Sequence, residues 1–120
     1  MPREFSRSRR VADLIQRELA VLIQRELDRD RVGLITLSAA EVSPDLSQAK
    51  IYFTSLDASL DEGDLTKELN RMSGHFRHGL ARCLRLKSMP ALKFVFDRSI
   101  ERGSRLSSLI DSLHKDSGEK

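Results

Sequence analysis

The chain has 120 residues, and 21 Lys and Arg against 18 Asp and Glu give it a net charge of +3 at pH 7. Hydrophobic residues make up 39% and charged residues 32%, a balance that is typical of one globular domain and excludes a disordered chain. No apolar run approaches the roughly 20 residues that span a bilayer, and no apolar segment of a secretory signal follows the basic N-terminus. We therefore expect a cytoplasmic protein without a membrane contact, and a single cysteine, Cys83, agrees with a reducing compartment.

The first predicted element is a long amphipathic helix over residues 7–28. Apolar residues recur at steps of three and four, which places them on one helical face. They are Val11, Leu14, Ile15, Leu19, Leu22, Ile23 and Leu27. Residues 1–6 are interpreted as a basic N-terminal tail, and Gly33 helps to mark the end of the helix and its charged extension.

Two strands are predicted next, over residues 35–42 and 48–56. Alternate residues of the second strand are apolar, namely Ala49, Ile51 and Phe53. The first strand changes its apolar phase along its length, which a β-bulge would explain. Between the strands, Pro44 presets the backbone for a turn and Asp45 can bond its own backbone, so we expect a hairpin.

The acidic stretch 57–64 is interpreted as a loop or a frayed helix start. Apolar residues at helical spacing then predict one helix up to residue 72 and another over 75–86. Gly74 lies between them, and glycine inside a helix costs about 1 kcal/mol relative to alanine. The pattern therefore predicts a helix–kink–helix unit with its break at Met72-Ser73-Gly74.

A third strand follows Pro90, where Leu92, Phe94 and Phe96 alternate with more polar residues. A last helix is predicted over residues 106–113, before a frayed polar C-terminal tail over 114–120. The order is α-β-β-α-α-β-α. It predicts one α+β domain over residues 7–113, in which helices cover one face of a three-stranded sheet.

Positive charge is concentrated in the third quarter of the chain. Residues 41–70 contain two basic and seven acidic residues, whereas residues 71–105 contain nine basic and two acidic ones. No Asp or Glu occurs between Arg71 and Lys93. At about 100° per residue, the basic and imidazole side chains of the 75–86 helix lie opposite its apolar stripe. An ordinary solvated surface is the alternative, but such surfaces mix both signs, so we favour an anion-binding surface.

The kink itself is a second argument for a polyanion ligand. The break at Ser73-Gly74 exposes backbone N–H groups at the start of the next helix, and these donors and the helix dipole favour a phosphate. Gly74 would let a nucleic-acid backbone approach closely, or it merely permits a corner between two helices; both can hold. The candidate RNA-binding residues are Arg71, Ser73, Gly74, His75, Arg77, His78, Arg82, Arg85 and Lys87, with Arg10 near the first helix start.

Base stacking, metal binding and catalysis receive less support. Aromatic residues make up only 5%, and Tyr52 and Phe5 alone look free to stack on a base, so recognition is expected through backbone and shape. His75 and His78 are disfavoured as metal ligands, because Cys83 is predicted on the apolar face and no fourth ligand is evident. No catalytic or cofactor-binding motif is present, and the acidic 57–64 stretch lacks the spacing of a calcium loop. We therefore expect no catalytic residue, no metal and no cofactor.

Three stretches together resemble the ribosome-binding factor A family. They are residues 7–33 with an Arg-Arg-Val start, residues 41–52 (Glu-Val-Ser-Pro-Asp-Leu-Ser-Gln-Ala-Lys-Ile-Tyr), and residues 85–103 with Pro90, Asp97, Ser99 and Gly103. The resemblance covers about residues 5–113 in matching order. It implies a type-II KH-like fold, although the Gly-x-x-Gly loop of ordinary KH domains is absent. The family's Ala-x-Gly kink is Met72-Ser73-Gly74 here, so a larger side chain replaces the alanine, and Ala91 stands where the family usually has Glu.

The resemblance also implies a function. Members bind free small (30S) ribosomal subunits during late maturation, contact their rRNA, aid processing of its 5′ end and are not enzymes. An assembly GTPase is an implied partner, and the protein is expected to be a monomer. Two alternatives are a protein-interaction module, which would expose a large apolar patch, and a small enzyme, which no motif supports.

Overall fold

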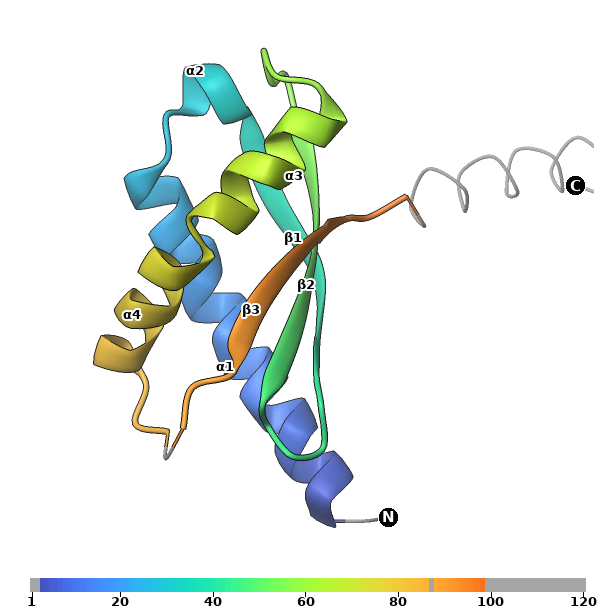
Figure 1. The fold of residues 1–120 in the computed structure, drawn as a ribbon, viewed down its shortest axis with the longest axis vertical. Coiled ribbons are helices and arrows are strands. Elements are labelled where there is room, and N and C mark those ends of the chain that lie inside the picture. The colour runs from blue at the N-terminus through green and yellow to red at the C-terminus, as the bar shows by residue number, and fades with distance from the viewer. Residues whose placement is uncertain (1–2, 87, 99–120) are drawn as a thin grey trace, which may run out of the picture.

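The computed structural model describes residues 3–86 and 88–98, and within residues 3–6 only the backbone. Seven elements follow one another within these described residues (Figure 1). They are α1 (Arg3–Glu26), α2 (Arg29–Val32), β1 (Leu34–Val42), β2 (Gln48–Leu56), α3 (Glu62–Arg71), α4 (Ser73–Cys83) and β3 (Ala91–Phe96). The helix predicted over 106–113 and the tail predicted over 114–120 lie outside the described residues.

The sheet has the strand order β1-β2-β3, with β1 and β2 antiparallel and β2 and β3 parallel. The pairing passes from Leu37–Phe53 to Ala39–Tyr52, so Ser38 is the extra residue of a bulge. This confirms the predicted bulge and explains the phase change, because one extra residue reverses which side chains point inward. The Ser38 hydroxyl contacts the buried Asp97 carboxylate beyond the end of β3.

Helices α1, α3 and α4 cover one face of the sheet, with α1 on β1 and with α3 and α4 on β3 (Figure 1). The fully buried rings of Phe53, Phe76 and Phe94 meet between the layers. The Phe94 ring packs edge-on against the other two, at centroid distances of 6.5 Å from Phe53 and 6.0 Å from Phe76. Edge-to-face packing of this kind adds to the apolar area that the rings bury. The predicted three-stranded sheet with helices on one face is confirmed.

The first helix differs from its predicted bounds. It begins at Arg3 rather than at residue 7 and ends at Glu26, and the charged residues that follow form the separate helix α2. The Asp28 side chain caps α2 by accepting from the backbone N–H of Asp30 at 3.0 Å. Gly33 therefore closes α2 rather than α1. Its φ of +74° and the Leu56 carbonyl oxygen, 2.4 Å from any Cβ placed there, both require glycine.

The predicted kink is confirmed, because only Met72 separates α3 from α4. Its φ of −95° and ψ of 7° interrupt the helix, while its carbonyl accepts from the Phe76 N–H at 3.0 Å and so starts the next one. The second helix ends earlier than predicted, at Cys83, because Leu84 is extended with φ −106° and ψ 138° and directs the chain back toward β3. Two expectations are thus wrong: Arg85 lies in a loop rather than on the helix, and Cys83 is exposed rather than in the core.

Candidate nucleic-acid interface

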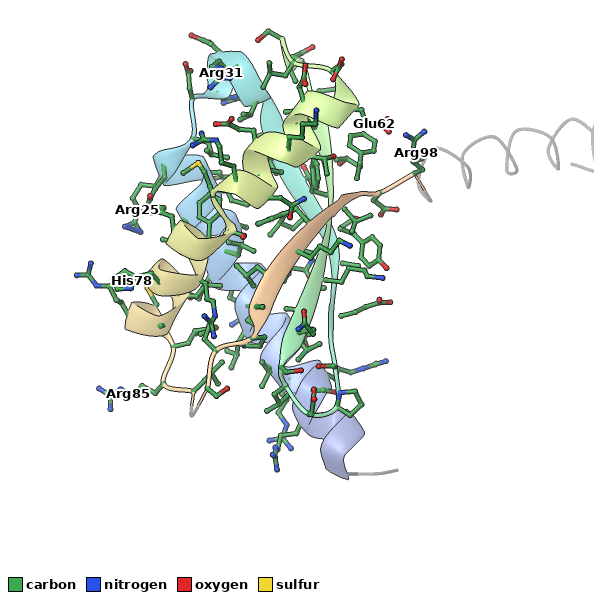
Figure 2. All side chains as sticks on the ribbon, in the orientation of Figure 1. Arg25, Arg31, Glu62, His78, Arg85 and Arg98 are labelled. Carbon is green, nitrogen blue, oxygen red and sulfur yellow. The ribbon has the colours of Figure 1, made fainter. Side chains whose placement is uncertain are left out.

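Helix α4 has one buried and one exposed face. Phe76 and Leu80 point into the core, whereas the basic and imidazole side chains of α4 are exposed, as the 3.6-residue period requires. Figure 2 shows His78 of α4 and Arg85 of the following loop projecting from the same side of the molecule. We call this region the α4 basic surface. It consists of His75, Arg77, His78, Arg82 and Arg85, all exposed.

Two contacts fix the kink and α4 in place. The side-chain amide of Asn70 donates to the Phe94 carbonyl at 3.0 Å and accepts from the Phe94 N–H at 2.8 Å, which ties the end of α3 to the edge of β3. On α4, a Cβ added to Gly79 would lie 3.2 Å from Cδ1 of Leu22, so α1 and α4 approach closely there. The basic surface is therefore presented on a helix that is held from both sides.

The start of α4 is open. No side-chain hydrogen bond from the described residues caps it, and its first turn contains no acidic residue. Gly74 is exposed in this turn, and a Cβ added there would meet nothing within 4 Å. The first N–H groups of any helix have no partner within the helix itself, so an uncapped start favours an anion. Ser73 and Gly74 thus lie where the sequence pattern predicted a phosphate contact.

Among the described residues, three of the predicted RNA-binding side chains have partners: Arg71, His75 and Arg77. Nη2 of Arg71 donates to Oε2 of Glu68 at 2.7 Å, and His75 contacts the Glu26 carboxylate. Nε and Nη2 of Arg77 both donate to the Met89 carbonyl, at 3.1 Å and 2.8 Å. These three side chains are therefore less available to a ligand than the sequence pattern alone indicates.

Glu68 neutralises part of the positive charge next to the kink. Arg31 lies on its other side, with Nη1 3.6 Å from the Oε2 that Arg71 contacts. The hydrogen bond from Arg71 and the charges of both guanidinium groups hold the pKa of Glu68 below its usual value, against a smaller opposing effect of burial. Glu68 is thus ionised at neutral pH, and Arg71 belongs to the charge balance of α3 rather than to the α4 basic surface.

The remaining predicted residues differ in where they lie and in whether they have a partner. His78, Arg82 and Arg85 make no hydrogen bond or ion pair within residues 3–86 and 88–98, so their charges or donors are available. Arg10 is exposed on α1 but precedes Leu22 by twelve residues, about 18 Å along the helix axis at roughly 1.5 Å per residue, and lies apart from this surface. Lys87 lies outside the described residues.

Two residues beside this surface were missed. Arg25 is exposed in the last turn of α1 and projects from the same side of the molecule as His78 (Figure 2). Glu26, one residue further, supplies the carboxylate at His75. The apolar period of α1 identifies which face is buried but not which helix lies next to it, so neither residue could be assigned to this surface from the chain alone.

The open face of the sheet has a different composition. Tyr52, expected to be free for stacking, is half-buried, and its hydroxyl donates to Oε1 of Glu41 at 3.2 Å. Nζ of Lys50 lies 6.0 Å from the Tyr52 ring centre. Lys93 on β3 is the cross-strand neighbour of Lys50. Acidic and basic side chains are mixed here. Within the described parts of the chain, no helix could cross a membrane and no group of three or more His, Cys, Asp or Glu side chains could hold a metal ion.

Comparisons with known proteins agree on one family. A family model described as ribosome-binding factor A matches residues 7–110. The ribosome-binding factor A of Nitrosococcus oceani is 52% identical over 111 residues, which cover 92% of this chain and 87% of that protein. The crystal structure of ribosome-binding factor A from Thermus thermophilus is 28% identical, with a TM-score of 0.64, and the match covers 73% of this chain and 93% of that one.

A second set of Thermus thermophilus coordinates was fitted into a cryo-electron microscopy map of a complex of ribosome-binding factor A with the 30S subunit. It is 30% identical, with a TM-score of 0.61, and the match covers 72% of this chain and 91% of that chain. These likenesses confirm the predicted KH-like fold, in which the α3–kink–α4 unit lies against β3.

Proposed function

Because the chain belongs to the ribosome-binding factor A family, we propose that it is a non-catalytic assembly factor that binds the RNA of the small ribosomal subunit. The observation that carries the proposal is the α4 basic surface, where Arg82 and Arg85 are exposed with no partner among the described residues and α4 contains no acid. The relative from Thermus thermophilus that was fitted into a 30S complex supports the choice of the small subunit as the partner.

The proposed contacts follow from the chemistry of the surface. Arg82 and Arg85 would pair with phosphates, which supplies affinity and makes binding sensitive to salt. The uncapped amides at Ser73 and Gly74 would accept one phosphate and so fix the register, without reading the base sequence. Arg25 would extend the same surface from α1.

Such a factor acts by binding one conformation of the RNA better than another. The free-energy difference between the two RNA forms changes by no more than the difference between the factor's binding free energies for them. We propose that the preferred form is an immature one, that holding it aids processing of the 5′ end of the rRNA, and that release accompanies maturation with the help of a GTPase. The protein would work as a monomer in the cytoplasm.

Charge reversal tests the surface. We expect the double variant Arg82→Glu/Arg85→Glu to bind purified small subunits more weakly, on the order of tenfold or more, because two phosphate contacts become repulsive. The measurement is co-sedimentation with small subunits, large subunits and whole ribosomes at two salt concentrations. Lys50→Glu/Lys93→Glu is the matched control: it makes the same change in net charge on the open face of the sheet and should bind nearly as the wild type does.

Two results would contradict the assignment. Unchanged binding of the α4 double variant, with an unchanged circular dichroism spectrum, would overturn the RNA-binding role of this surface. Equal losses in the two double variants would show that only net charge matters. Binding that does not respond to salt would favour a protein partner, since phosphate contacts release counterions and must weaken as salt rises.

A further inference from the structure

Residues 84–86 and 88–90 are the described parts of the connection between α4 and β3, which we call the 84–90 loop. Its last residue, Pro90, is fully buried, and Leu84 and Leu86 are half-buried against the core. Arg77 lies on the first half of α4, yet both Nε and Nη2 of its guanidinium donate to the carbonyl of Met89 in this loop. Arg85, in the same loop, is exposed and has no partner within the described residues.

The geometry at Arg77 is that of a tether. Nε and Nη2 form one of the edges with which a guanidinium binds a phosphate or carboxylate in a bidentate manner, and the Met89 carbonyl occupies this edge. A lysine at the same place would keep the positive charge but could not reproduce the paired donors. An Arg77→Lys substitution therefore separates the effect of the positive charge from the effect of the paired Nε and Nη2 donors.

We propose that Arg77 is a positioning residue: it holds the 84–90 loop against α4 and thereby presents Arg85 to RNA, rather than binding RNA through its own fork. The RNA half of this inference rests on the proposed function, whereas the tether itself does not. Arg77 thus moves from the predicted contact set to a supporting role, and Arg85, displaced from the helix, stays on the α4 basic surface because of it.

The free protein tests the tether without any ribosome. We expect Arg77→Lys to be cleaved by trypsin after Arg85 several-fold faster than the wild type, because the loop is released while the charge is kept. Arg82→Lys is the matched control, since Arg82 lies on the same helix and has no partner within the described residues. Its cleavage after Arg85 should be unchanged. Equal acceleration at every trypsin site of Arg77→Lys would indicate general destabilisation and overturn a local tether.

Binding to purified small subunits tests the consequence. Arg77→Lys should weaken binding several-fold with the same dependence on salt, because no charge is lost. Arg17→Lys makes the same change at an exposed arginine of α1 outside the α4 basic surface and should bind nearly as the wild type does. In an Arg85→Gln background, Arg77→Lys should cause little further loss, since the loop no longer has a guanidinium to present.

The outcomes separate the two levels of the proposal. If Arg77→Lys weakens binding equally with and without Arg85, Arg77 acts independently of Arg85 and the positioning role is overturned. If Arg77→Lys binds and is cleaved as the wild type is, the tether has no effect and the inference fails entirely. If the wild type itself does not bind small subunits, the proposed function fails, and so does the inference that Arg77 presents Arg85 to RNA. The trypsin result still decides whether Arg77 holds the loop.

Discussion

Helices α3 and α4 are two halves of one interrupted helix, and their inner faces are alike. Each half buries two large apolar side chains, Leu65 and Leu69 on α3 and Phe76 and Leu80 on α4. Their outer faces and ends differ. α3 pairs its last arginine, Arg71, with its own Glu68, whereas α4 ends beside an exposed Arg82 that has no partner in the described part of the chain.

The two helix starts differ in the same sense. The Asp61 side chain accepts from the Asp64 N–H at 2.8 Å, and Glu62 and Asp64 place more negative charge in the first turn of α3. In the described part of the chain, α4 has no side-chain cap and no acid in its first turn, and Glu26 of α1 is the acid that contacts its His75. Because a helix start favours negative charge, α3 satisfies this preference internally and α4 leaves it largely to a ligand. Packing therefore places both halves, while charge and capping decide which half can bind an anion.

Truncation of one buried leucine in each helix tests whether the inner faces of α3 and α4 contribute alike to stability, and it should have the largest effect. Leu69→Ala and Leu80→Ala remove the same atoms from fully buried sites on α3 and α4. Each should lower the free energy of unfolding by about 2–5 kcal/mol through lost burial and the cavity left behind. Urea unfolding of both variants measures this. A loss below about 1 kcal/mol for Leu80→Ala alone would show that α4 is not part of the cooperative core.

The second effect tests the difference at the helix starts. Asp61→Ala removes the cap of α3 and should lower the free energy of unfolding by about 1 kcal/mol. Asp61→Asn is the control, because it removes the charge but keeps an oxygen that can accept from the Asp64 N–H. The two variants are compared by thermal unfolding. If Asp61→Ala has no effect, then capping does not distinguish α3 from α4 and the contrast between the two starts rests on charge alone.

Much of the fold could be predicted because its signals are local. The phase change in β1 indicates the bulge at Ser38, and Gly74 next to a helical spacing indicates the kink at Met72. Both features are recorded in neighbouring residues, since a bulge shifts the alternation of one strand and a break shifts the period of one helix. The α2 helix was missed because its four residues are too few to show an apolar period.

The candidate surface could be predicted only in part, because its details depend on contacts between distant segments. The sequence pattern located the acid-free helix, but it placed Arg85 on that helix, because no local signal marks the extended Leu84. It also could not place Glu26 beside His75, or the Met89 carbonyl beside Arg77. A cationic side chain in a pattern has a known charge, and only the fold decides whether that charge already has a partner.

The smallest expected effect tests whether the open start of α4 is functional. Gly74→Ala should raise the free energy of unfolding by about 0.5–1 kcal/mol, because alanine restricts the unfolded chain and the added Cβ meets nothing within 4 Å. Gly79→Ala is the control on the same helix, and it should gain less, since its Cβ would lie 3.2 Å from Leu22. Thermal unfolding measures both.

We further expect Gly74→Ala to bind small subunits more weakly although it is more stable, because the added methyl group occupies the space where a phosphate would approach the helix amides. A variant that gains stability and binds as the wild type does would show that this glycine only permits the corner between α3 and α4, and the proposed interface would then consist of the arginine side chains without the helix start.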